Sequence, residues 1–163
     1  MSRKTAFVLG STDHGSMILN RYDYSHDAGG YFGVGYNLLE HSAFDPQDVS
    51  LLKNVLDFCR ATRGDGVIAV DGGANIGVHT IEWAKHMTGW VYVSGVEAQE
   101  RIFYALAGNV ALNNCFNARG LNAALTEDGE PVRMPVPYYC APGSFGSIEL
   151  KECANTENIG KTI

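Results

Sequence analysis

The apolar positions of the chain separate a polar first part from a second part in which helical and strand patterns alternate. Apolar residues recur with helical spacing at 46–63, form a continuous run at 67–70, and then predict a helix at 76–87, a strand at 91–96, a helix at 99–113 and a weaker strand at 119–125. A continuous apolar run is typical of a parallel strand that is buried on both faces of a sheet. The pattern therefore predicts an α/β fold with a mainly parallel sheet.

The first helix carries its own boundary signals. Asp45 can cap it, Pro46 suits the first helical position, and Gly64 follows its last turn. We expect an inner face formed by Val49, Leu52, Val55, Leu56 and Cys59.

Residues 1–45 are rich in Gly, Tyr, Asp, Asn and His and show no sustained period, apart from a possible short strand at 6–9. We therefore expect an irregular N-terminal arm over 1–45 and an α/β domain over 46–163. After residue 125 the alternation stops, and 132–137 and 147–151 read as two short strands around a loop.

Composition limits the functional classes. The chain has 163 residues and a net charge of −6, without any run of five basic residues, so we do not expect a nucleic-acid partner. No apolar run approaches the ~20 residues of a membrane span or a signal-peptide core, which predicts a soluble, cytoplasmic protein without a membrane partner. The four cysteines form no CxxC pair, so we expect free, mostly buried thiols and no metal site.

A glycine-rich turn at 71–77 lies between a predicted strand and a predicted helix. Gly72, Ala74 and Gly77 form a relaxed G-x-A-x-x-G pattern, and Glu97 ends the next strand, 20 residues beyond Gly77. At that position a carboxylate can accept hydrogen bonds from both ribose hydroxyls. The arrangement predicts nucleotide-type binding, with a tight turn beside an incidental surface glutamate as the alternative.

The residue before the first glycine indicates which nucleotide-type ligand the turn would bind. Asp71 would place a carboxylate beside a pyrophosphate, which is unfavourable. S-adenosylmethionine has no phosphates, and its ammonium group can use an acidic partner. An NAD(P)-dependent oxidoreductase remains the alternative because the relaxed glycine pattern permits it.

Four separated segments then carry a family resemblance. These are Asp-x-Gly-Ala-Asn-x-Gly at 71–77, Val-Glu-Ala-Gln at 96–99, the asparagine-bearing helix end at 109–113, and Asn-Ala-Ala-Leu at 122–125. Together they resemble the FkbM family of S-adenosylmethionine-dependent methyltransferases over about residues 64–151. The resemblance implies a Rossmann-like class I fold, a doubly wound sheet, and methyl transfer to a hydroxyl of a sugar, polyketide or other small metabolite.

The resemblance also assigns cofactor-binding residues. It implies that the turn, Gly72 and Ala74 included, lines the methionine side of the cofactor through Asp71, Gly73, Asn75 and Gly77. Glu97 would hold the ribose, Ala98 would flank the adenine, and Asn122 and Ala123 would lie near the adenine edge.

One family motif is missing. Members of the family continue into a strand with Lys-x-Asp-x-Glu-Gly, which does not occur here. We therefore expect the domain to hold the cofactor-binding part and to be incomplete at its C-terminus. A homo-oligomer formed through the incomplete sheet, or a non-catalytic fragment that pairs with a partner, follows as an alternative.

Candidates for catalysis are few. His79 lies one turn into the helix after the glycine-rich turn and is a candidate general base, with a solvent-facing or core role as the alternative. His26 and Asp23 are weaker candidates. The segment 29–36, in which glycines alternate with aromatic residues, is interpreted as a lid or as a packed surface loop, and 143–147 is a candidate border of the acceptor site.

Overall fold

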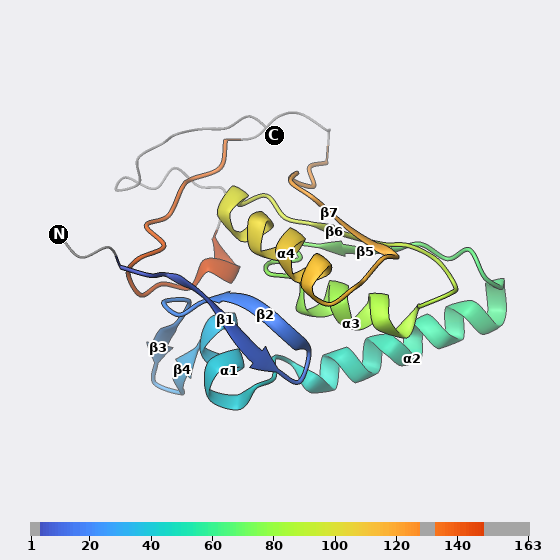
Figure 1. Ribbon diagram of the computed structural model, residues 1–163, viewed down its shortest axis with the longest axis horizontal. Coiled ribbons are helices and arrows are strands. Elements are labelled where there is room, and N and C mark those ends of the chain that lie inside the picture. Colours follow the sequence, from blue (N-terminus) through green and yellow to red (C-terminus); the bar gives the residue numbers. More distant parts are fainter. Residues whose placement is uncertain (1–3, 128–132, 149–163) are drawn as a thin grey trace.

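The computed structural model describes residues 4–127 and 133–148 (Figure 1). Its elements are, in chain order, β1 (Phe7–Thr12), β2 (Gly15–Asn20), β3 (Ser25–Asp27), β4 (Gly30–Phe32), α1 (Val34–His41), α2 (Pro46–Arg63), β5 (Ala69–Gly72), α3 (Val78–His86), β6 (Val93–Val96), α4 (Glu100–Leu112), β7 (Ala118–Leu121) and a 3-10 turn at Phe145–Ser147. The predicted mixed α/β character is confirmed. Strand β5 has the predicted length but lies two residues later than predicted, and β6 and β7 are shorter than predicted.

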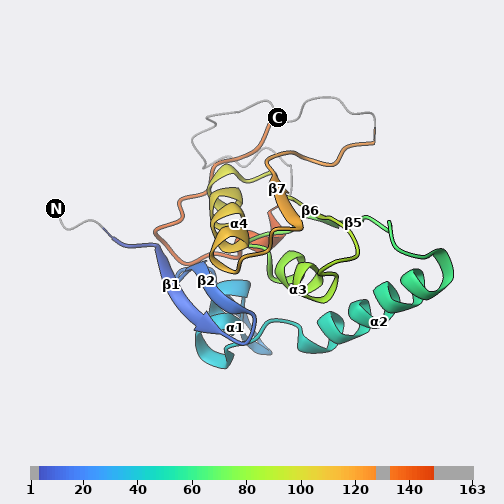
Figure 2. The same cartoon turned by 45° about the vertical axis from the view of Figure 1, so that its right-hand side comes forward.

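The central sheet has three parallel strands in the order β5-β6-β7. Helices α3 and α4 follow β5 and β6, and both pack on the same face of the sheet (Figures 1 and 2). Gly95 and Gly120 lie on that face, where an added Cβ would meet Thr80 Oγ1 at 2.6 Å and Phe103 Cε2 at 3.1 Å. These glycines let the helices approach the strands closely.

The other face of this sheet is less covered than the sequence predicted. Val70 is 56% exposed and Ile68 is 64% exposed, although both belong to the apolar run expected to be buried on both faces. The prediction was wrong because α3 and α4 both pack on one face of the sheet, and Val70, which alternates with the buried Ala69 and Asp71, points to the other face. Burial of alternate strand residues depends on neighbouring elements, which an apolar run does not reveal.

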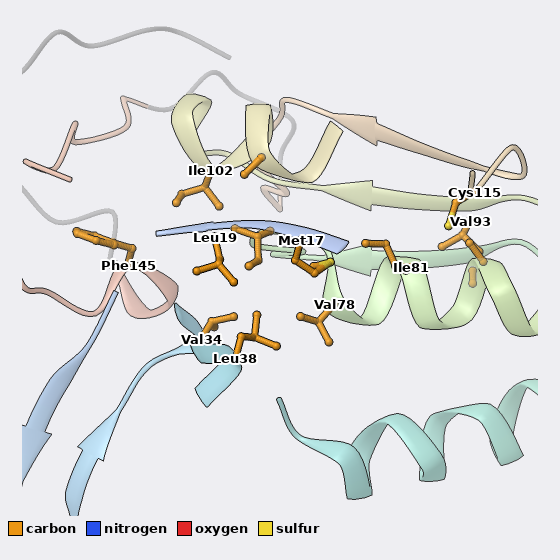
Figure 3. Close-up of a cluster of buried hydrophobic side chains, with 14 of the residues drawn as sticks. Met17, Leu19, Val34, Leu38, Val78, Ile81, Val93, Ile102, Cys115 and Phe145 are labelled. Atoms are coloured by element: carbon orange, nitrogen blue, oxygen red, sulfur yellow. The ribbon is translucent and has the colours of Figure 1, made fainter. Parts of the chain in front are cut away.

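The first 45 residues are not irregular, which corrects the expectation for this arm. Strands β1 and β2 form an antiparallel hairpin in which Phe7 pairs with Asn20 and Thr12 with Gly15. Met17 and Leu19 of β2 are fully buried and pack into the main core beside α4 (Figure 3). The hairpin is therefore part of the domain core rather than an appendage.

One side chain of α4 holds this hairpin in place. Asn109 is fully buried, accepts a hydrogen bond from the Ile18 N–H at 2.5 Å, and donates to the Ile18 and Ile76 carbonyls at 3.0 and 2.8 Å. The same amide therefore joins β2 to the residue that precedes Gly77. Because these bonds satisfy buried backbone groups, they position the hairpin against the glycine-rich turn.

Helix α2 has the predicted bounds but not the predicted packing. Asp45 adopts φ 44° and makes no side-chain capping bond, and Val49 is the single fully buried residue. Val55, expected on the inner face, is 47% exposed. The helix contacts α3 largely through polar groups, such as the bond between His86 Nε2 and Asp57 Oδ1 at 2.9 Å.

The C-terminal part also differs from the prediction. Within 133–148 there is a 3-10 turn and an isolated bridge between Asp23 and Gly143, but no strand. The remainder of the two predicted strands lies outside the described residues. Cys59, Cys115 and Cys140 are free thiols, of which only Cys115 is buried, so the expectation of mostly buried cysteines was wrong. In the part of the chain that is described, no helix is both long and apolar enough to span a membrane.

Candidate functional site

In the glycine-rich turn, the backbone N–H groups of residues 73–77 already have hydrogen-bond partners within the protein, and we therefore call it the closed turn. The five backbone N–H groups of residues 73–77 all donate within the protein, to the Val96 and Ala74 carbonyls, the Glu97 carboxylate and the Asn75 side chain, at 2.7–2.9 Å. A loop that binds pyrophosphate directs free N–H groups at the ligand. This turn has none to offer between residues 73 and 77.

A first cavity of about 340 Å³ lies between this turn and the ends of β6 and β7. It brings together six of the predicted cofactor residues: Gly72, Gly73, Asn75, Glu97, Ala98 and Ala123. Other wall residues had not been assigned to the cofactor, among them Gln99, Leu125, Met134 and Ile148, and Gly146 belongs to the segment 143–147 that was predicted to border the acceptor site. Met134 and Ile148 lie in two segments predicted as short strands, a pattern that did not indicate a place beside the turn.

Glu97 is the central polar group of the first cavity. Its side chain is nearly buried, and its two oxygens accept hydrogen bonds from the Asn75 N–H at 2.9 Å and the Gln99 N–H at 2.8 Å. Burial raises the pKa of this carboxyl above its usual value, against the opposing effect of those backbone donors. Because each carboxylate oxygen has two lone pairs, Glu97 can still accept hydrogen bonds from a ligand in the cavity.

Three of the predicted cofactor residues are not among the described residues that line the first cavity. They stabilise the structure around it. Asp71 faces α3 and accepts a hydrogen bond from Thr80 Oγ1 at 2.6 Å. Gly77 has φ 91°, and an added Cβ would collide with Leu106 Cδ1. Asn122 donates from Nδ2 to the Glu97 and Ala98 carbonyls at 2.9 and 3.2 Å, and so supports the residues that do line the cavity.

A second cavity of about 470 Å³ adjoins the first. The two share Gly73, Asn75 and Gly146 in their walls. Predicted residues Ala74 and His79 line this second cavity. Other lining residues come from the N-terminal part of the chain: Phe32, Gly33, Val34, Asn37, Phe44 and Asp45.

The segment 143–147 lies beside both cavities and is held from two sides. The Phe145 N–H donates to Asp23 Oδ1 at 2.9 Å, and Gln99 Nε2 donates to the Phe145 carbonyl at 2.7 Å. Ser144 lines the second cavity, and Gly146 lines both. This segment therefore borders the second cavity, and its predicted place beside an acceptor stays a prediction.

Asp23 is not placed to act as a base. It is 4% exposed, and its carboxylate accepts the Gly35 N–H at 3.1 Å as well as the Phe145 N–H. Burial raises the pKa of this carboxyl, although the backbone donors oppose the shift. Asp23 anchors the start of α1 to the segment 143–147, two walls of the second cavity.

His26 lies in the β3-β4 hairpin and is likewise not part of either cavity's described lining. Its ring centre is 5.6 Å from that of Tyr31, in a cluster of aromatic rings on this hairpin. The neighbouring segment 29–36 forms β4 and the start of α1, and only its residues Phe32, Gly33 and Val34 reach the second cavity.

His79 lines the second cavity from the first turn of α3. Its ring lies 5.9 Å from the Trp83 ring and 6.4 Å from the Phe44 ring. Its Nε2 is buried and has no hydrogen-bond partner among the described residues. His79 is thus half-buried at the cavity wall, neither solvent-facing nor satisfied within the core.

These features define a mixed α/β protein with a three-stranded parallel sheet, compatible with a Rossmann-like fold. Two adjoining cavities lie at the carboxyl end of this sheet, where open α/β sheets bind ligands. Comparison of the sequence with protein-family models and with curated proteins finds no match. Among the residues that the structure describes, no group of three or more His, Cys, Asp or Glu side chains is placed to hold a metal ion.

Proposed function

We propose that this protein is an S-adenosylmethionine-dependent methyltransferase that acts on a hydroxyl group of a small molecule. The observation that carries the proposal is the closed turn beside Glu97. A carboxylate that can accept ribose hydroxyls lines the cavity, while no N–H group of residues 73–77 is free for a phosphate. That combination favours a nucleoside ligand without phosphates over NAD. The resemblance of the turn and of 96–99 and 122–125 to the FkbM family supports the same proposal.

The first cavity matches the adenosine part of the cofactor. Glu97 would hold the ribose hydroxyls, while Ala98 and Ala123 offer apolar surface to the adenine. Gly73 has φ 75° and no atom within 4 Å of an added Cβ, so a ligand can lie directly over its backbone.

The methionine part would then extend over Gly73 and Asn75 toward the second cavity, which shares both residues. No side chain caps the N-terminus of α3, whose first residues Val78 and His79 line that cavity. The N-terminal turn of a helix favours a single carboxylate, such as the one on the methionine part, whereas a pyrophosphate would also need the N–H groups of residues 73–77, which are all used within the protein. Asp71 faces away toward Thr80, so we do not assign it to the ammonium group.

When bound, S-adenosylmethionine supplies an electrophilic methyl group attached to a sulfonium. The chain contributes alignment and exclusion of water, because the segment 143–147 and the start of α1 enclose the space beside the turn. His79 is the titratable group at the wall of the second cavity nearest in sequence to the turn, and we assign it the removal of the acceptor's hydroxyl proton.

Thermal unfolding with different ligands tests the proposal. A ligand of the native state raises the melting temperature in proportion to the logarithm of its concentration over its Kd. We expect S-adenosylmethionine and S-adenosylhomocysteine to raise it and NAD to leave it unchanged. Glu97→Gln should reduce the shift strongly at the same ligand concentration, whereas Glu40→Gln, which removes an exposed carboxylate outside both cavities, should retain it. A shift with NAD alone would contradict the proposal.

A further inference from the structure

We propose that the second cavity is the acceptor site, and that it selects a compact neutral or cationic alcohol with a flat apolar body over an anionic one. This inference rests on the proposed function, because it treats the neighbouring cavity as the cofactor site. It goes further by assigning the chemical class of the acceptor and the residue that discriminates among acceptors.

The walls of the second cavity determine the apolar body. Phe32 and Phe44 present aromatic rings, and Val34, Ile76 and Val78 add aliphatic surface. Val34, Ile76 and Val78 are buried and belong to the main core, so this part of the wall is held in place by packing. Figure 3 shows Val34 and Val78 in this core. A volume of about 470 Å³ lies within the range of small-molecule sites and suits a single ring with a short chain.

Asp45 determines the charge preference. It is the one Asp, Glu, Lys or Arg among the described residues that line the second cavity. It neither caps α2 nor forms an ion pair with another described residue. Its carboxylate is therefore available to an ammonium or hydroxyl group and opposes a carboxylate or phosphate at the same place.

The effect of Asp45 is moderate because the residue is exposed. Exposed ion pairs are worth little, and the corresponding change in affinity is about two- to fivefold. The net charge of −6 acts in the same direction on any anionic acceptor. Salt should weaken this preference, because exposed charges are screened.

Three probes that share one skeleton isolate the charge. Tyramine is cationic, tyrosol is neutral and 4-hydroxyphenylacetate is anionic, and each combines a phenol ring with a two-carbon chain. Titration calorimetry with protein saturated with S-adenosylhomocysteine should give the tightest binding for tyramine and the weakest for 4-hydroxyphenylacetate. The ratio of their dissociation constants should be about four to twenty-five, since attraction and repulsion each contribute two- to fivefold.

Asp45→Asn tests the role of charge in acceptor binding, and Phe32→Ala tests the role of the apolar wall. Asp45→Asn should lower the ratio to the smaller value that the net charge of the protein still causes, and should leave binding of S-adenosylhomocysteine unchanged, because asparagine tolerates the backbone conformation at φ 44°. Asp48→Asn, which removes an exposed carboxylate of α2 outside the described lining, is the matched control and should keep the ratio. Phe32→Ala removes an exposed ring and should weaken all three probes about equally.

The outcomes are distinguishable. If S-adenosylhomocysteine itself does not bind, the proposed function fails and the inference fails with it. If S-adenosylhomocysteine binds but no probe binds, or if 4-hydroxyphenylacetate binds as tightly as tyramine, the inference alone is overturned. A ratio that Asp45→Asn leaves unchanged would also overturn the role of Asp45.

Discussion

Glu97 and Asp23 are two buried carboxylates that make the same kind of contact in different parts of the molecule. Each accepts hydrogen bonds from backbone N–H groups of two segments, and burial raises the pKa of each. Glu97 also lines the first cavity, whereas Asp23 is not part of either described lining. A buried carboxylate that accepts backbone hydrogen bonds therefore holds two segments together. It can also bind a ligand only where it lines a cavity.

The largest effect should follow from removing the charge of Glu97. In Glu97→Gln the ribose hydroxyls lose a charged acceptor, and hydrogen bonds to charged groups are worth about 1.5–3 kcal/mol. We expect the Kd for S-adenosylhomocysteine to rise about 10- to 150-fold in titration calorimetry. An unchanged Kd in a folded variant would show that Glu97 is an anchor alone, as Asp23 is.

Asp23→Asn tests the other half of the comparison. The variant loses one of the oxygens that accept the Gly35 and Phe145 N–H groups, and a buried donor left without a partner costs about 1–3 kcal/mol. We expect urea unfolding to show a loss of stability of that size, together with weaker tyramine binding. Affinity for S-adenosylhomocysteine should fall less than in Glu97→Gln, and an equal fall would contradict the distinction between the two carboxylates.

The two carboxylates also differ in how far the sequence could predict them. Glu97 ends the predicted strand at 91–96, 20 residues beyond Gly77 of the glycine-rich turn, so its place follows from local pattern. Asp23 bonds to Phe145, 122 residues away, and lies in a segment without periodicity. The alternation β5-α3-β6-α4-β7 was likewise predictable, because each element carries its own apolar period.

Other features depend on which segments meet. The possible strand at 6–9 overlaps β1, but the rest of the β1-β2 hairpin escaped prediction because its fully buried residues, Met17 and Leu19, become core positions only when α4 covers them. The exposure of Val70 depends on which elements cover its face of the sheet. The second cavity is built partly from Phe44 and Asp45, which carry no local signal for binding.

A third carboxylate, Glu82, sharpens the comparison because the side chains of His14 and Lys53, rather than backbone N–H groups, surround it. Its hydrogen bond to His14 at 3.1 Å, and then its contact with Lys53, lower its pKa from 4.5 to about 2. A lowered pKa in the folded state gives stability that is complete above about pH 4.5 and is lost as the pH falls toward 2. The contribution is about 3 kcal/mol.

Urea unfolding between pH 6 and pH 2.5 checks this. Glu82→Gln should remove part of the loss of stability that the wild type shows below about pH 4.5. Asp23→Asn should have the opposite effect, because a carboxyl with a raised folded pKa gains stability on protonation. Parallel pH profiles for the wild type and both variants would contradict the assigned directions.

The smallest effect is expected at Asn122. Its Nδ2 bonds to the Glu97 and Ala98 carbonyls support the cavity wall without entering the described lining. In Asn122→Ala we expect the Kd for S-adenosylhomocysteine to rise about two- to tenfold, the value of one or two neutral hydrogen bonds. A loss as large as that in Glu97→Gln would place Asn122 in direct contact with the ligand.

The central claim is that the cavity beside the closed turn binds the adenosyl cofactor. Amide chemical-shift perturbation during titration of the ¹⁵N-labelled protein with S-adenosylhomocysteine tests this claim most directly. We predict saturable shifts concentrated at Gly73, Asn75, Glu97, Ala98 and Ala123, and no such shifts with NAD. Shifts with NAD at these residues, or no saturable shift with S-adenosylhomocysteine, would contradict the account.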